Sequence, residues 1–258
     1  MTPREMIAAL HEGRRVYGSA MIGPSPLWPG LMKQAGLDFV FIDTEHIPLD
    51  RQTLAWMCQT CSALGMPPVV RIPSPDPYEA CKVLDGGASG VIAPYLETVE
   101  QIQQLVGAIK LRPLKGRRLQ AALADRNSLQ PELRSYIEQR AADRIFIANI
   151  ESVPAIENLD AICSVPGLDA VLIGPHDLSC SLGIPEQYGH PKFDEAVRTI
   201  FRIARARGVG AGIHYWLGVE QEIEYAKAGA NLIMHSSDLT LFSKTLKSEI
   251  EALRKALA

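Results

Sequence analysis

A repeated unit, in which a short apolar segment precedes a longer amphipathic one, constrains the fold most strongly. The short segments are rich in Val, Ile and Phe and are almost continuously apolar, which is typical of parallel strands covered on both faces. There are eight of them, at residues 15–21, 38–43, 67–72, 89–94, 144–150, 169–174, 209–215 and 231–236. The pattern predicts eight parallel strands separated by helices.

Glycine marks the ends of several predicted helices, just before the next strand. The left-handed backbone conformation that often ends a helix favours glycine. The candidate positions are Gly36, Gly65, Gly86 or Gly87, Gly208 and Gly229.

Eight strand–helix units in 258 residues predict a single α/β domain, residues 1–258, folded as a closed (β/α)8 TIM barrel. An open, doubly wound sheet is the alternative, since the strand count alone does not show closure. No G-x-G-x-x-G follows the first strand and no phosphate-loop lysine motif occurs, which weakens its nucleotide-binding version. An Arg-rich insert at about 111–143 interrupts the alternation of apolar and amphipathic segments. Loops of that length are usually functional or mobile.

The charge balance excludes some classes of partner. Lys and Arg number 26 against 29 Asp and Glu, a net charge of −3, so the chain lacks the basic surface that nucleic acid requires. No apolar run approaches the roughly 18 residues that span a bilayer. The first 15 residues form an amphipathic helical pattern without a secretion-signal core. We expect a cytoplasmic globular protein with no nucleic-acid or membrane partner.

The cysteines do not form a disulfide framework. There are five, an odd number, and Cys58 and Cys61 form a C-x-x-C inside an apolar helical stretch. Redox motifs of this type open a helix after a strand, whereas this pair lies within one. We therefore interpret the two thiols as packing groups rather than as metal ligands or a redox pair.

Polar and ionisable side chains gather at the predicted C-terminal ends of the strands, where barrel enzymes carry their chemistry. In chain order they are Asp43, Thr44, Glu45, His46, Arg71, Asn149, Glu151, His176, Asp177, His214 and His235. Because buried charges are costly unless paired or coordinated, ionisable groups that close several apolar strands usually share a purpose.

Some of these residues also have ordinary structural explanations. Asp177 is a candidate helix N-cap, and Glu151 precedes a helix whose dipole favours a negative charge. Arg71 is a candidate ion-pair partner, and His46 a candidate loop histidine. Only the combination favours a catalytic site.

Glu151 and Asp177 end consecutive predicted strands, which a parallel barrel places side by side. Two neighbouring carboxylates repel each other, and a divalent cation is a common remedy. Oxygen ligands favour Mg²⁺ or Mn²⁺ over Zn²⁺. Two protein ligands leave coordination positions open for water and substrate, which is typical of a catalytic rather than a structural site.

Five segments resemble the HpcH/HpaI aldolase family, class II metal-dependent pyruvate aldolases of the phosphoenolpyruvate/pyruvate barrel superfamily. The resemblance extends from about Gly18 to about Leu241, and the segments occur in the family's order. They are FIDTEH (41–46), VVRIP (69–73), GVIAPYLETVEQ (90–101), IANIES (147–152) and GPHDLSCSLG (174–183).

The resemblance implies an activity: cleavage or formation of 4-hydroxy-2-oxoacids, with pyruvate as the enolate partner and an aldehyde as the other. It implies Glu151 and Asp177 as ligands of Mg²⁺ or Mn²⁺, with Co²⁺ or Zn²⁺ as alternatives. His46 would be the catalytic base, Arg71 would hold the ketoacid oxygen, and Asp43 would orient the region of the base.

The resemblance also implies roles for residues around the metal ligands. Glu45 would lie near the metal-bound waters, and Asn149 would lie beside the metal ligands. The backbone amides around Gly174, Pro175, His176 and Asp177 would bind the pyruvate carboxylate, as anions favour a helix start. A homo-oligomer, often a hexamer, is implied as well.

The lysines favour the metal route over the Schiff-base strategy of other aldolases. A Schiff-base lysine inside a buried strand would have its pKa lowered by burial. All nine lysines lie outside the eight apolar segments, so none of them is in such a position.

The sequence departs from the family pattern at His176, Asn149, His214–Tyr215 and Ala20, positions that would shape the pocket beyond pyruvate. Arg117, Arg118 and Arg126 of the insert are candidates either for recognising a distal substrate group or for a solvated oligomer contact. Two alternative functions stay open: a CoA-thioester lyase of the citrate lyase β-subunit or malyl-CoA lyase type, and a non-catalytic ketoacid-binding barrel.

Overall fold

The computed structural model describes residues 1–215 and 218–257 and contains a closed barrel of eight parallel strands. Each strand pairs with the next along the chain, and β8 pairs with β1. The strands are β1 Val16–Ala20, β2 Phe39–Asp43, β3 Pro68–Arg71, β4 Gly90–Ala93, β5 Ile145–Ile150, β6 Ala170–Ile173, β7 Gly210–Tyr215 and β8 Leu232–Ser237. The predicted barrel is confirmed, and the open-sheet alternative is wrong.

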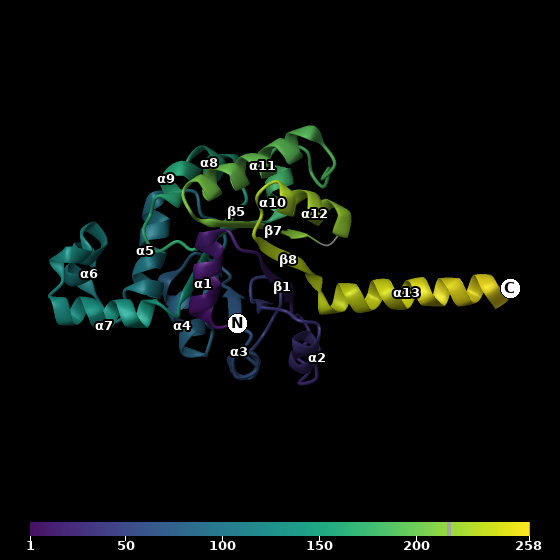
Figure 1. Cartoon of the computed structure of the whole chain (residues 1–258), viewed down its shortest axis with the longest axis horizontal. Coiled ribbons are helices and arrows are strands. Elements are labelled where there is room, and N and C mark those ends of the chain that lie inside the picture. The colour runs from purple at the N-terminus through teal and green to yellow at the C-terminus, as the bar shows by residue number, and fades with distance from the viewer. Residues whose placement is uncertain (216–217, 258) are drawn as a thin grey trace.

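Helices follow the strands and surround the barrel (Figure 1). They are α1 Pro3–Glu12, α2 Trp28–Gln34, α3 Arg51–Ala63, α4 Pro77–Asp85, α5 Val99–Lys110, α6 Gly116–Ala124, the 3₁₀ turn η1 Arg126–Ser128, α7 Pro131–Ala141, α8 Val153–Glu157, α9 Leu159–Cys163, α10 Pro175–Ser181, α11 Pro191–Ala206, α12 Val219–Lys227 and α13 Asp238–Leu257. None of the described helices is long and apolar enough to cross a bilayer.

Glycines with a left-handed backbone end several helices, as predicted. Gly36, Gly65, Gly87, Gly208 and Gly229 all adopt positive φ angles, between 70° and 124°. Of the two candidates after α4, it is therefore Gly87 that takes the left-handed conformation, and Gly86 stays helical with φ −73°.

The strands build two cores because successive side chains point to opposite faces. Phe39, Phe41, Val69 and Ile147 belong to the inner core, which α1 closes from below with Met6, Ala9 and Leu10. Val40, Ile42 and Val70 belong to the outer core, packed under the helices. This alternation also decides which strand-end side chains enter the barrel mouth.

The Arg-rich insert is not a loop. It folds as α6, η1 and α7 around a small apolar cluster of its own, made of Leu111, Leu114, Ala122, Leu129 and Ile137. Because the insert joins α5 to β5, it lies at the N-terminal ends of the strands, away from the catalytic face. The hypothesis that its arginines recognise substrate in their own chain is therefore wrong.

The C-x-x-C cysteines lie inside α3, and both are buried. Burial raises the pKa of Cys58 to about 12 and that of Cys61 to about 11. Since the thiolate is the reactive form, these thiols are inert packing groups, as the sequence indicated.

Candidate active site

Asp43 and Arg71 lie opposite each other on β2 and β3 and share one face of the sheet. Asp43 accepts hydrogen bonds from Arg71 Nε at 2.9 Å and from Nη2 at 2.6 Å. The guanidinium also lies over the ring of Phe41, with 5.5 Å between Cζ and the ring centroid. These contacts fix Arg71 in the barrel mouth, and Asp43 orients this arginine.

The ion pair sets the protonation of both partners. Although burial alone would raise the pKa of Asp43, the hydrogen bond and charge of Arg71 lower it below its ordinary value. Burial likewise opposes the charge of Arg71, but Asp43, Glu45 and Glu151 together raise its pKa. Both groups are therefore charged, and the site keeps a permanent cationic donor.

Three carboxyl groups, which we call the carboxylate trio, influence one another at the mouth: Glu45, Glu151 and Asp177. Glu45 Oε2 lies 3.1 Å from Arg71 Nε, but no described hydrogen bond reaches this buried oxygen. Burial, with contributions from the charges of Asp177 and Glu45, raises the pKa of Glu151 to about 7. The trio thus concentrates negative charge beside Arg71.

Glycine at position 174 lets β6 approach Glu151 closely. A Cβ at Gly174 would lie 2.6 Å from Glu151 Oε1, closer than non-bonded atoms tolerate. The same oxygen accepts a hydrogen bond from Asn149 Nδ2 at 2.6 Å, while Asn149 Oδ1 is buried with no hydrogen-bond partner among the described groups. The arrangement orients Glu151 toward the strand that leads to Asp177.

Asp177 lies in the first turn of α10, whose N-cap is Gly174. The N-cap explanation of Asp177 is therefore wrong. Pro175 has no N–H, so His176 and Asp177 supply the first N–H groups of α10 that have no carbonyl partner within the helix.

A cavity of about 420 Å³ joins most of the predicted residues. Its walls combine apolar and polar side chains. They are formed by Ile22, Phe41, Asp43, His46, Ile47, Arg71, Asn149, Leu172, Ile173, Gly174, Pro175, His176, Asp177 and His214.

His46 lies at the rim of this cavity, with its side chain 60% exposed. Its Nε2 is 3.8 Å from Glu45 Oε2, and the ring has access to both solvent and the cavity. A half-exposed imidazole beside a carboxylate is well placed to exchange protons with a bound molecule and with water.

Tyr95, two residues beyond the end of β4, was missed by the sequence analysis. It adopts a left-handed backbone with φ 56°, and its N–H donates to Glu151 Oε2 at 3.3 Å. A hydrogen bond with Glu45, reinforced by burial and the nearby carboxylates, raises the pKa of Tyr95 to about 12. A signal was available, because Tyr95 follows the C-terminal end of β4 as Glu45 follows that of β2.

The two histidines at the ends of β7 and β8 point in different directions. His214 faces the cavity, its ring edge-on to Phe41, and its Nε2 lies 3.2 Å from the Ser236 carbonyl oxygen. Burial lowers the pKa of His214 to about 4, so it is neutral near pH 7. The neighbouring Tyr215 side chain lies outside the described residues.

His235 does not point into the mouth, which corrects the prediction. Leu232 and Met234 of β8 face the inner core, so the alternation directs His235 outward. There its Nδ1 lies 2.6 Å from Glu222 Oε2 of α12.

The donor set fits a divalent cation. Within residues 1–215 and 218–257, no three His, Cys, Asp or Glu side chains converge as a complete ligand set. Glu151 and Asp177 nevertheless supply hard oxygen donors, and an incomplete set leaves positions for substrate. A cation there would offset both the burial and the carboxylate repulsion that raise the pKa of Glu151.

Residues 25–245 match the sequence profile described as HpcH/HpaI aldolase/citrate lyase. The chain belongs to this family. A 2-keto-3-deoxy-L-rhamnonate aldolase of Salmonella gallinarum is 32% identical over 243 residues, 93% of this chain and 90% of the relative. Its counterpart in Salmonella typhi is 34% identical over 223 residues, 84% of this chain and 80% of the relative.

Solved structures agree in fold. An HpcH/HpaI aldolase from Desulfitobacterium hafniense superimposes with a TM-score of 0.83 at 26% identity, covering 96% of this chain and 95% of that one. The citrate synthase SbnG superimposes with a TM-score of 0.82 at 28% identity, covering 97% of both.

This member of the HpcH/HpaI family is an aldolase, a carbon–carbon lyase that makes or breaks a 4-hydroxy-2-oxoacid with pyruvate as one partner. The expectation from sequence is confirmed, and the non-catalytic alternative is wrong. Class II aldolases of this family generally depend on a divalent metal ion, and their substrates are small ketoacids and aldehydes.

Proposed function

We propose that the enzyme cleaves a 2-keto-3-deoxy sugar acid between C3 and C4, releasing pyruvate and a small hydroxyaldehyde. The relatives named 2-keto-3-deoxy-L-rhamnonate aldolase, at 32–34% identity, support this substrate class. The mixed apolar and polar walls of the 420 Å³ cavity suit a short polyhydroxylated chain. His176, which lines the same cavity, offers ring nitrogen atoms to the hydroxyls of the aldehyde half.

Glu151 and Asp177 are the residues we assign to the metal, with Mg²⁺ or Mn²⁺ favoured by their oxygen donors and Co²⁺ or Zn²⁺ as alternatives. When bound, such a cation supplies Lewis-acid stabilisation of the negative charge that develops on the ketoacid. Glu45, which lies beside Arg71, is assigned to the water molecules next to these ligands.

Arg71 is assigned to the ketoacid 2-oxo oxygen. In cleavage, the C3–C4 electron pair moves into the pyruvate half and places negative charge on that oxygen. A donor already fixed by Asp43 and Phe41 needs no reorganisation when the charge forms, which is the basis of electrostatic catalysis. The amides of His176 and Asp177, beside Gly174 and Pro175, are assigned to the carboxylate.

His46 is assigned the proton transfers. It takes the proton of the 4-hydroxyl group as the C3–C4 bond breaks and the aldehyde forms. A proton then returns to C3 and yields pyruvate. The exposure of the ring at the cavity rim supports direct transfer or transfer through one water molecule.

One observation carries this assignment: the carboxylate trio lies beside a fixed arginine at the mouth of the barrel. The test is pyruvate release from a 2-keto-3-deoxy sugar acid before and after chelation. We expect chelation to abolish release and Mn²⁺ or Mg²⁺ to restore it. Full activity of rigorously metal-free enzyme would rule out the mechanism.

The CoA-thioester alternative has one point of support, the solved citrate synthase at 28% identity. The citrate lyase β-subunit structure, at 16% identity, shows the fold alone. Assaying citrate formation from acetyl-CoA and oxaloacetate in parallel separates the two activities.

We further propose that the enzyme works as a homo-oligomer, with a hexamer as the family's common form.

A further inference from the structure

One imidazole of the catalytic cavity is free to contact the substrate beyond the reacting carbon atoms. His176 lies in the first turn of α10, lines the 420 Å³ cavity and has a side chain that is 57% exposed. The other histidines of the cavity are committed elsewhere. His46 is assigned the proton transfers, and Nε2 of the buried His214 lies 3.2 Å from the Ser236 carbonyl oxygen.

A carboxylate accompanies this imidazole at the rim. Glu186 belongs to the loop between α10 and α11, and its Oε1 lies 3.7 Å from His176 Nδ1. That separation is within ion-pair distance but too long for a hydrogen bond. Among the residues that the structure describes, no hydrogen bond engages either side chain. Both groups therefore keep their hydrogen-bonding capacity for a bound molecule.

One buried hydroxyl holds the two residues together through their backbones. Ser179 is fully buried in α10; its Oγ donates to the His176 carbonyl oxygen at 2.7 Å and accepts from the Glu186 N–H at 2.9 Å. Glu186 adopts φ 57°, a left-handed conformation that costs energy for any residue except glycine. An exposed ion pair contributes little to stability in return. Strained residues of this kind are typical of functional sites.

The charges around the cavity disfavour a second carboxylate on the substrate. Of the described residues that line the cavity, Arg71 is the one with a permanent positive charge, and Asp43 and Glu45 already pair with it. Glu186 adds a negative charge beside His176. A carboxylate at the far end of an aldehyde would be repelled there, whereas a hydroxyl group finds a partner on either side chain.

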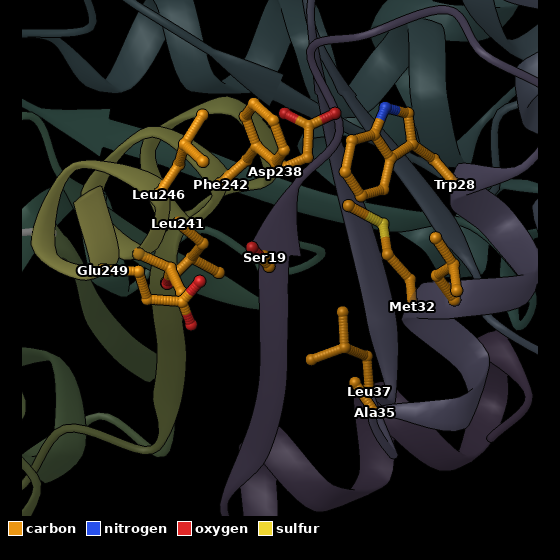
Figure 2. Close-up of a pocket in the computed structure, with 12 residues that line it drawn as sticks. Ser19, Trp28, Met32, Ala35, Leu37, Asp238, Leu241, Phe242, Leu246 and Glu249 are labelled. Atoms are coloured by element: carbon orange, nitrogen blue, oxygen red, sulfur yellow. The ribbon is translucent and has the colours of Figure 1, made fainter. Parts of the chain in front are cut away.

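A second cavity, of about 460 Å³, is less suited to hydroxyl groups. Figure 2 shows it between α2 and α13, with Trp28 and Phe242 among its mostly apolar walls. Its Asp238 carboxylate already accepts hydrogen bonds from the N–H groups of Ile22 at 3.1 Å and Gly23 at 2.9 Å. A polyhydroxylated chain therefore finds its polar partners in the catalytic cavity.

We propose that His176 and Glu186 together select the aldehyde half of the substrate, accepting short neutral hydroxyaldehydes and rejecting aldehydes that end in a carboxylate. The ring of His176 forms a hydrogen bond with a hydroxyl group of the aldehyde. Glu186 orients that ring and repels a second negative charge. The inference rests on the proposed function, because it concerns the same cavity and the same carbon–carbon bond.

The test measures kcat/KM for the addition of pyruvate to different aldehydes at saturating Mn²⁺. Glyceraldehyde carries hydroxyl groups, propanal is its counterpart without them, and succinic semialdehyde ends in a carboxylate. The ratio of glyceraldehyde to propanal reports hydroxyl recognition, and the ratio of succinic semialdehyde to propanal reports charge rejection. Because each ratio is taken within one protein, a general loss of activity cancels.

Three variants separate hydrogen bonding from charge. His176→Ala removes the ring, Glu186→Gln removes the charge but keeps an amide oxygen, and Glu186→Ala removes both. The matched control is Glu195→Gln, which changes an exposed carboxylate of α11 outside the cavity lining. All of these side chains are exposed, so the fold should survive, which circular dichroism and melting check.

The variants should change the two ratios separately. We expect His176→Ala to lower the glyceraldehyde-to-propanal ratio by about 2- to 10-fold, the contribution of one hydrogen bond. Glu186→Gln should raise the succinic semialdehyde-to-propanal ratio by about 2- to 5-fold, the size of an interaction between exposed charges, and keep most of the hydroxyl preference. Glu186→Ala should change both ratios, and the control should keep the wild-type values.

Two kinds of result would overturn the proposal. The first is an unchanged glyceraldehyde ratio in His176→Ala, or an unchanged succinic semialdehyde ratio in both Glu186 variants. The second is a wild type whose kcat/KM is higher for succinic semialdehyde than for glyceraldehyde.

A measurement without any aldehyde separates this failure from failure of the proposed function. Exchange of the pyruvate methyl protons for solvent deuterium, followed by NMR in the wild type, reports formation of the enolate alone. Exchange combined with unchanged ratios in the variants would refute only the selection by His176 and Glu186. Absence of exchange would refute the proposed function and, with it, the selection.

Discussion

Asp43 and Arg71 occupy paired positions on neighbouring strands, and both carboxylate oxygens of Asp43 accept hydrogen bonds from the one guanidinium. Both side chains are largely buried, 8% and 12% exposed. The pair therefore links the stability of the barrel mouth to the position of the cationic donor.

Asp43→Ala should destabilise the protein, because it leaves a buried charge with less compensation. Breaking a buried ion pair costs about 3–5 kcal/mol, and Glu45, still 3.1 Å from Arg71 Nε, places the expected loss near the lower end. Urea unfolding measures it. The control is Asp194→Ala, which breaks the exposed pair with Arg198 and should cost less than about 1 kcal/mol. Equal losses would contradict the argument.

Asp177→Asn and His46→Ala should fail in different ways. Asp177→Asn removes an assigned ligand charge, so metal affinity should fall first, as calorimetric titration with Mn²⁺ would show. His46→Ala should lower kcat by about 10²–10⁴-fold while metal affinity stays near the wild-type value, as expected for loss of a general base. If His46→Ala lost the metal and retained turnover at saturating Mn²⁺, the two roles would be wrongly assigned.

Gly174→Ala should weaken metal binding without unfolding the barrel. The new methyl group would lie 2.6 Å from Glu151 Oε1 and must push that carboxylate aside. We expect at least about a tenfold loss of Mn²⁺ affinity, comparable to other changes around metal ligands. Gly189→Ala is the matched control, because nothing lies within 4 Å of its added methyl group. Identical affinities in the two variants would argue against Glu151 as a ligand.

His214 should make the protein less stable in acid. Burial lowers its pKa from the ordinary 6.5 to about 4 in the folded state. Between these values the unfolded chain binds the extra proton, so stability is full above pH 6.5 and decreases as the pH falls toward 4. The complete loss is at most about 3 kcal/mol.

His214→Leu removes this titration. Unfolding free energies of the wild type and the variant, measured from pH 7.5 to pH 4, should show a smaller acid loss in the variant. Parallel curves would mean that the imidazole is not held neutral in the cavity wall.

The sequence predicted the strands and most surrounding helices because apolar periodicity and glycine helix ends are local properties. It also indicated that Asp43, His46, Arg71, Glu151 and Asp177 lie at the C-terminal ends of strands, since polar residues that follow apolar runs are visible in one dimension. Almost continuously apolar strands, however, hide which residues face inward. For that reason His235 was assigned to the mouth, although the alternation of β8 directs it toward Glu222.

The sequence by itself determined the barrel and its edge of ionisable residues, because both follow from spacing along the chain. Only the tertiary structure decided which partners meet across it: Tyr95 beside Glu45 and Glu151, and the arginine insert at the far end of the barrel. These relationships depend on strand register and helix direction, which are fixed by packing between segments distant in sequence.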